Sequence, residues 1–252
     1  MITESIIEIS TWVWIGIAII TFISLIILKV RAPYGRHSRQ GWGMMIDNHW
    51  GWFWMELPAL VIVPIIALTG SAEKTSLHWV LIALWTIHYT NRTLIFPFRL
   101  KTKGKKMPIS IVFSAAFFNL INGLLNGYAL GYMALPTLPT ALFVLGVVIF
   151  VVGFYINQRA DNYLIGLRRK QSGYLVPQGW LFNRISCPNL FGEIVEWTGF
   201  AIAACSLQAF SFALWTFANL VPRAMNHHDW YLETFPEYPK DRKAVIPSIL
   251  RK

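Results

Sequence analysis

Two glutamates interrupt an otherwise apolar stretch, NLFGEIVEWTGFAIAA, which begins at residue 189. Burying an ionisable group in a segment that is built to leave water is costly, so by default such a group marks a functional site. Asn189, Glu193 and Glu196 lie at i, i+4 and i+7, which places them on one stripe of an α-helix. This stripe of amide and carboxyl groups predicts a binding face for a polar ligand.

Two further segments carry polar side chains at helical spacing: Asn157, Asp161 and Arg168 in one, and Arg223, His227 and Tyr231 in the other. The first three project within about 40° of one another on an ideal helix. A solvated helix end is the alternative interpretation of that group. Taken together, the three stripes predict one polar pocket, with donors and acceptors that suit phosphate, amide and ribose groups.

Polar residues also lie in two earlier apolar segments, WFWMELPAL and WTIHYTNRTLIF. Glu56 is in the first, and Trp85, His88, Tyr89 and Arg92 share a helix face in the second. A carboxylic acid and a phenol at depth are the groups needed to polarise a carbonyl oxygen that gains negative charge. The alternatives are an interfacial carboxylate for Glu56 and a helix–helix hydrogen-bond network for the second segment.

Composition indicates the elements that position these side chains. The chain has 252 residues, of which 55% are hydrophobic and 13% charged, whereas soluble domains carry about 25% charged residues. Apolar runs of about 20 residues are long enough to cross a bilayer as helices. We therefore expect an all-α integral membrane protein forming a single domain, residues 1–252, with seven transmembrane helices. The predicted spans are 10–30, 51–70, 77–98, 108–134, 138–157, 189–206 and 208–222.

The boundary between the last two spans is poorly defined, because AACSLQAFSF leaves little room for a turn, and six spans is the alternative. Seven spans place 20 of the 22 Lys and Arg residues on one side, all except Lys74 and Arg92. Basic residues are retained in the cytoplasm, so we expect the N-terminus outside and the C-terminus in the cytoplasm. This membrane placement explains the net charge of +10 without a nucleic-acid partner.

Several function classes lack their sequence signals. There is no GxGxxG fingerprint and no Walker A loop, so a bound nucleotide must be held in another way. Cys187 and Cys205 have no metal-ligand spacing, and we expect no metal. The chain has no internal repeat of the kind that would indicate a transporter. No dimer motif is present, and we expect a monomer.

A series of short blocks then resembles one known family: PYGRHS, ELP, HYTNRT, NGLLNGY, PQGWLF, NLFGEIVEW, RAMNHHDWYL and EYPKDRKAVIP. In order and spacing the chain resembles the steroid 5α-reductases, also called 3-oxo-5α-steroid 4-dehydrogenases. It looks closest to the vertebrate type-2 enzyme and its bacterial homologues. The resemblance covers nearly the whole chain.

The resemblance implies an NADPH-dependent reduction of the Δ4 double bond of 3-oxosteroids such as testosterone or progesterone. Hydride would go to C5 and a proton to C4, with Glu56 and Tyr89 binding the 3-oxo group. The implied cofactor residues are Trp52, Lys103, Lys105, Asn157, Asp161, Arg168, Tyr174, Asn189, Glu193, Arg223, His227 and Tyr231. The membrane would be the bacterial cytoplasmic membrane or the endoplasmic reticulum.

The chain departs from the type-2 pattern at Met55, where that pattern has Gln, and by an insertion around RLKTKGKK that affects the assignment of Lys103 and Lys105. The sequence therefore leaves the steroid open. The alternatives are a membrane enoyl-thioester or sterol double-bond reductase, and an isoprenylcysteine-type methyltransferase that binds S-adenosylmethionine.

Overall fold

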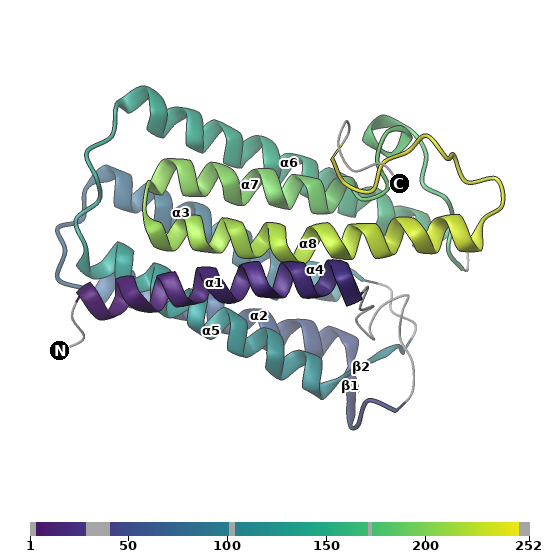
Figure 1. Cartoon of the computed structure of the whole chain (residues 1–252), viewed down its shortest axis with the longest axis horizontal. Coiled ribbons are helices and arrows are strands. Elements are labelled where there is room, and N and C mark those ends of the chain that lie inside the picture. The colour runs from purple at the N-terminus through teal and green to yellow at the C-terminus, as the bar shows by residue number, and fades with distance from the viewer. Residues whose placement is uncertain (1–3, 29–40, 101–103, 171–172, 247–252) are drawn as a thin grey trace. The chain divides into compact units, whose positions relative to one another are not determined.

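The computed structural model describes residues 4–28, 41–100, 104–170 and 173–246, and most of this part is helical (Figure 1). It divides into two compact units. Unit 1 consists of Met1–Thr11, Ala32–Pro139 and Ala204–Ala209, and unit 2 of Trp12–Arg31, Thr140–Ala203 and Phe210–Lys252. The first helix, α1 (Glu4–Leu28), contributes residues to both units.

In unit 1, α2 (Asn48–Thr69) packs along α5 (Ile109–Tyr132). Their packing uses three glycines four residues apart on α5: Gly123, Gly127 and Gly131. A Cβ on Gly131 would lie 2.4 Å from the carbonyl oxygen of Ile66, so the two backbones touch there. Small residues at this spacing are typical of close helix pairs in membranes.

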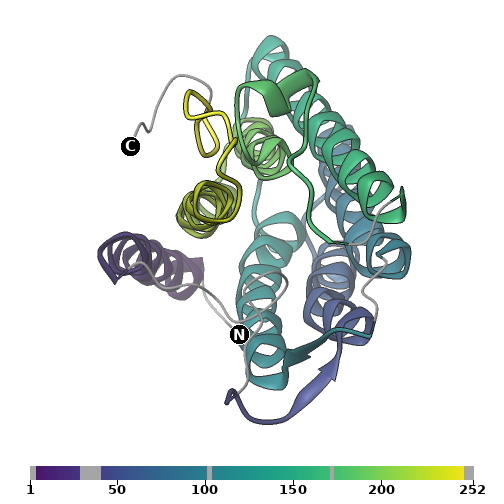
Figure 2. The same ribbon diagram turned by 90° about the vertical axis from the view of Figure 1, so that its right-hand side faces the viewer.

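A two-stranded antiparallel sheet joins the starts of α2 and α5 (Figure 2). Strand β1 (Met45–Asp47) pairs with β2 (Lys106–Pro108), and Ile46 lies opposite Met107. Met107 is fully buried and packs with Met55 and Val112. This small core joins the start of α5 to α2 near Trp52, one turn before Glu56.

The next helical segment of unit 1 changes its winding part-way along. Helix α3 (Ser76–Thr90) continues into a π-helical turn, η2 (Asn91–Ile95), and then into α4 (Phe96–Arg99). The backbone N–H of Phe96 donates to the carbonyl oxygen of Asn91, five residues earlier. Pro97 follows and has no N–H to donate, so regular helical bonding is interrupted there. Single π-helical turns are frequently found at functional sites.

In unit 2, α6 (Thr140–Lys170) and α7 (Pro188–Ala204) lie side by side (Figure 1). Each helix contributes two glycines seven residues apart: Gly146 and Gly153 on α6, and Gly192 and Gly199 on α7. A Cβ on Gly153 would lie 2.2 Å from the backbone nitrogen of Glu196. We call this four-glycine contact the glycine seam.

The last long helix, α8 (Leu207–Thr234), follows α7 after a two-residue turn. Cys205 takes a positive φ of 44° in that turn, and Ser206 Oγ accepts from the backbone N–H of Ala209. This turn resolves the sequence ambiguity around AACSL, because α7 and α8 are separate helices. In unit 2, Trp215 on α8 donates from Nε1 to the carbonyl oxygen of Trp14 on α1, over 3.1 Å.

The structure confirms a nearly all-α fold, and each predicted span overlaps a helical segment in the part of the chain that the structure describes. Four helices of the described part are long and apolar enough to cross a membrane: Glu4–Leu28, Asn48–Thr69, Ile109–Tyr132 and Thr140–Arg169. The helix that carries the fifth predicted span, 138–157, continues to Lys170. The seven-span count, the orientation of the termini and the single domain stay predictions.

Candidate functional site

Glu56 of unit 1 sits among polar groups from two other segments. Asn119 on α5 donates from Nδ2 to Glu56 Oε2 over 3.1 Å and to the carbonyl oxygen of Met55 over 2.7 Å. Arg92 Nη2 lies 4.0 Å from Glu56 Oε1, and the two side chains are only 11% and 13% exposed. Glu56 is therefore held by side chains from two other helical segments and does not simply extend to solvent at a helix end.

Arg92 is itself held by aromatic rings. Its guanidinium carbon lies 4.9 Å from the ring centre of Trp52 and 5.0 Å from that of Phe96. The two rings also meet edge to face, with centres 5.8 Å apart. Arg92 belongs to the π-helical turn, so the 3.6-residue period used to align it with Trp85 does not hold there. It nevertheless reaches Glu56.

Tyr89 is 4% exposed and lies between two ring neighbours on α3. Its ring centre is 5.0 Å from those of Trp85 and His88. Trp85 Nε1 donates to the carbonyl oxygen of Ala59 over 2.9 Å, which ties α3 to α2. The phenol and the Glu56 carboxyl are thus carried by two helices that are joined by a buried hydrogen bond.

A second polar cluster lies in unit 2, at the end of the glycine seam. Asn157 Nδ2 donates to the carbonyl oxygen of Asn189 over 3.1 Å and lies 3.5 Å from Glu193 Oε2. Asn189 Nδ2 donates to Asp161 Oδ1 over 2.9 Å. Asn157 and Asp161 are buried, whereas Asn189 and Glu193 are half-buried. Two of the predicted stripes, on α6 and α7, therefore meet as one hydrogen-bonded group.

The chain is similar over most of its length to proteins of one known family. The family model described as 3-oxo-5-alpha-steroid 4-dehydrogenase matches residues 105–250. The steroid 5-alpha-reductase DET2 of Gossypium hirsutum is 43% identical over 242 residues, which cover 92% of this chain and 93% of the relative. The chain belongs to the 3-oxo-5-alpha-steroid 4-dehydrogenase family.

Two animal relatives of this oxidoreductase family are similar over nearly the same length. The 3-oxo-5-alpha-steroid 4-dehydrogenase 1 of Bos taurus is 38% identical and that of Homo sapiens 36% identical. The alignments cover 89% and 88% of this chain, and 91% and 87% of the relatives. Family membership is therefore confirmed, and the expected similarity to the type-2 enzyme stays a prediction.

The remaining predicted cofactor residues of the steroid dehydrogenase are placed as follows. In unit 2, the guanidinium of Arg168 lies 5.9 Å from the ring of Tyr174, which packs edge-on against Trp230 of α8. Arg223, His227 and Tyr231 all lie on α8, as their spacing predicted. Trp52 and the exposed Lys105 belong to unit 1, and Lys103 lies outside the described residues.

Sequence reasoning missed Asn119 as a partner of Glu56 in this member of the steroid dehydrogenase family. A signal was present, because Asn119, Asn122 and Asn126 recur at i, i+3 and i+7 in an apolar helix, and all three are buried. Asn122 and Asn126 donate to the carbonyl oxygens of Phe118 and Asn122 in their own helix. Asn119 instead donates to Met55 and Glu56 on α2, a contact that only the fold reveals.

Proposed function

We propose that the chain reduces the Δ4 double bond of a 3-oxosteroid with NADPH, in a membrane that it crosses seven times with the N-terminus outside. The observation that carries this is the hydrogen-bonded amide and carboxyl cluster of Asn157, Asp161, Asn189 and Glu193, found in a chain of the steroid dehydrogenase family.

The unit 2 cluster has the chemistry of a dinucleotide site. Amide and carboxyl groups suit the carboxamide and ribose hydroxyls of the cofactor. Arg168 and Arg223 supply guanidinium donors suited to phosphates. We propose that Tyr174, His227 and Tyr231 complete this set. Bound NADPH supplies the hydride that goes to C5.

The unit 1 cluster then acts on the steroid's 3-oxo group. The β-carbon of an enone accepts hydride poorly until its oxygen is hydrogen-bonded. Tyr89 donates a hydrogen bond from its phenol to that oxygen, and a protonated Glu56 carboxyl donates the second. The enolate that forms then takes a proton at C4. Donors fixed before the reaction stabilise the enolate as its charge develops, and removing one such donor costs about 10²–10³ in rate. Arg92 and Asn119 keep the Glu56 carboxyl in one orientation.

The test is NADPH oxidation by the purified chain with testosterone, progesterone and an enoyl thioester, together with product analysis for the 5α-dihydro-3-oxosteroid. We expect turnover of a steroid and a fall of about 10²–10³ in kcat for Tyr89→Phe, with the NADPH dissociation constant unchanged. Tyr155→Phe is the matched control, because Tyr155 is 56% exposed on α6.

Three outcomes would contradict the proposal. Turnover of the thioester alone would assign the chain to another class of enone reductase. Retention of S-adenosylmethionine in place of NADPH, identified by mass spectrometry, would favour a methyltransferase. Full activity of Tyr89→Phe would remove the phenol from the mechanism.

A further inference from the structure

One serine hydroxyl in unit 2 is shared by three segments of the chain. Ser186 Oγ lies 2.7 Å from the hydroxyl of Tyr238, 2.6 Å from His228 Nδ1 and 3.2 Å from the carbonyl oxygen of Lys243. Ser186 lies two residues before the start of α7, His228 lies on α8, and Tyr238 and Lys243 belong to the segment after α8. Ser186, His228 and Tyr238 are between 3% and 8% exposed, and we call them the hydroxyl hub.

The chemistry of these groups assigns the protons. The Lys243 carbonyl can only accept, so Ser186 donates its single proton there. In the two remaining contacts Ser186 Oγ must then accept. The donors are the Tyr238 hydroxyl and His228, whose ring carries a proton on Nδ1. Burial raises the pKa of Tyr238, despite hydrogen bonds with Ser186 and Arg242 that lower it, so the phenol keeps the proton that it donates. Every contact of the hub is satisfied in this arrangement.

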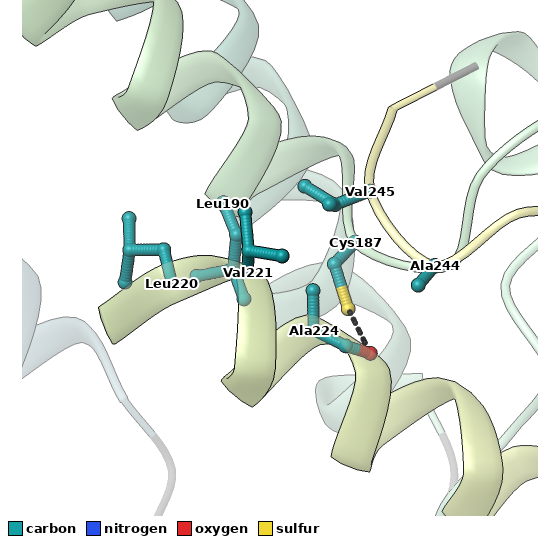
Figure 3. Packing of buried hydrophobic residues seen from close by; sticks show 7 residues of the cluster. All are labelled: Cys187, Leu190, Leu220, Val221, Ala224, Ala244 and Val245. Atoms are coloured by element: carbon teal, nitrogen blue, oxygen red, sulfur yellow. Dashed lines mark hydrogen bonds between the residues drawn. The ribbon is translucent and has the colours of Figure 1, made fainter. Parts of the chain in front are cut away.

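The segment after α8 is firmly attached where it meets the hub. Ser186 N donates to Lys243 O over 2.9 Å, Lys243 N donates to Arg184 O over 2.9 Å, and Cys187 N donates to Ala244 O over 3.1 Å. Ala244 and Val245 pack with Cys187, Leu190, Leu220, Val221 and Ala224 in an apolar cluster (Figure 3). The segment after α8 is therefore held in two ways, by polar contacts at the hub and by apolar packing of Ala244 and Val245.

Arg242 secures the same segment from a second direction. Its Nη1 donates to the carbonyl oxygen of Pro177 over 2.8 Å, and its guanidinium lies 5.0 Å from the ring centre of Tyr238. Arg242 is only 5% exposed. A guanidinium stacked on a ring and bonded to a carbonyl at the same time restricts the rotation of Tyr238.

Each residue of the hydroxyl hub is close to a residue of the proposed cofactor site, either in space or along the chain. The ring of Tyr238 stacks on Tyr231, with centres 5.1 Å apart and planes within 8°. His228 follows His227 on α8, and Asn189 lies three residues after Ser186, in the first turn of α7. The three neighbours, Tyr231, His227 and Asn189, come from two helices whose ends meet at the hub.

We propose that the hydroxyl hub is a positioning device, which fixes the start of α7 against the end of α8 so that Asn189, His227 and Tyr231 are ordered before NADPH binds. This inference rests on the proposed function. Fixing binding groups in advance lowers the entropy lost on binding. The hub residues act through their neighbours and need not touch the cofactor.

The experiment compares Tyr238→Phe and Ser186→Ala with wild-type full-length protein. The dissociation constant for NADPH is measured by tryptophan fluorescence, and kcat and KM for steroid are measured at saturating NADPH. Loss of one such hydrogen bond should raise the NADPH dissociation constant about five- to tenfold in Tyr238→Phe, a change of about 1.0–1.4 kcal/mol. Ser186→Ala should raise it further, because it removes the hydroxyl that both the Tyr238 phenol and His228 Nδ1 contact.

Two control variants separate positioning from general damage. Ser186→Thr keeps the hydroxyl and should restore NADPH affinity. Tyr155→Phe removes an exposed phenol of unit 2 that accepts from Arg159, and should bind NADPH as wild type does. If Ser186→Ala fails to fold, Tyr238→Phe carries the test, since it keeps the ring that stacks on Tyr231 and Arg242.

A wild-type NADPH dissociation constant in Tyr238→Phe and Ser186→Ala would overturn the inference, even with a lower melting temperature, and would leave the proposed function standing. Unchanged NADPH affinity with a lower kcat would also overturn it, because positioning for binding must appear in affinity. Failure of the wild-type protein to bind NADPH would instead refute the proposed function and the inference with it.

Discussion

Replacing Gly153 with Ala tests the close approach of α6 and α7. The new Cβ would lie 2.2 Å from the backbone nitrogen of Glu196 and 2.6 Å from its Cα. Both atoms belong to the backbone, so no change of rotamer relieves the overlap. Carbon contacts are unstrained at about 3.5 Å, and the two helices must therefore separate locally by about 1 Å.

Two costs follow from that separation. Forcing extra volume into a packed contact costs about 1–3 kcal/mol. The Asn157 contacts across the same pair of helices, at 3.1 Å and 3.5 Å, lengthen as well, and each hydrogen bond contributes about 0.5–1.5 kcal/mol. For a chain of this size a loss of about 2–3 kcal/mol lowers the melting temperature by roughly 5–10 °C.

The assay is thermal unfolding of the purified protein in one detergent, followed by intrinsic tryptophan fluorescence. Gly166→Ala is the matched control, because Gly166 lies on the same helix and a Cβ there meets nothing within 4 Å. Ala is the better helix former by about 0.5–1 kcal/mol, so Gly166→Ala should melt at or above the wild-type temperature. Equal melting of Gly153→Ala and Gly166→Ala would refute the close approach, whatever reaction the chain performs.

Two further predictions address single side chains. Arg92→Gln removes a charge 4.0 Å from Glu56. We expect kcat for steroid reduction to fall at least about tenfold while NADPH affinity is unchanged. An unaltered kcat would show that Arg92 has no role in the reaction. Burial raises the pKa of Tyr238, so the folded state holds the phenolic proton more tightly than the unfolded state. The stability this provides is complete below about pH 10 and is lost as pH rises through the raised pKa. The wild-type melting temperature should therefore fall more steeply above about pH 10 than that of Tyr238→Phe, and parallel pH profiles would contradict this.

The helices and their polar stripes were predictable from the sequence because both follow from spacing along one helix. Hydropathy located all the long helices, and the i, i+4 spacing placed Asn157 with Asp161 and Asn189 with Glu193 on common faces. The extent of α6 beyond residue 157 was not predicted as part of that span, because its last turns are charged and hydropathy no longer distinguishes them from a loop. A helix that leaves a membrane loses its apolar signal before it loses its hydrogen bonds.

Pairs between helices were not predictable in the same way. The contact of Arg92 with Glu56 depends on a π-helical turn, which has no reliable composition signal. The bonds that converge on Ser186 join residues up to 57 positions apart, and they depend on how a non-helical segment docks. Glycine spacing was the unused signal, because repeated small residues in apolar helices indicate which faces meet.

The glycine seam also accounts for the different surroundings of the two glutamates on α7. Glu196 is fully buried, and its backbone lies against Gly153, so it occupies the closest part of the seam. Glu193 lies about one turn towards the start of α7, is half-buried and faces Asn157. A Cβ on Gly192 would lie 2.4 Å from the backbone nitrogen of Asn157, so Asn157 also lies at the seam. The glycines thus bring the two backbones close enough for short amide side chains to bond across them. A seam of larger residues would hold Asn157 and Glu193 too far apart to form one polar group.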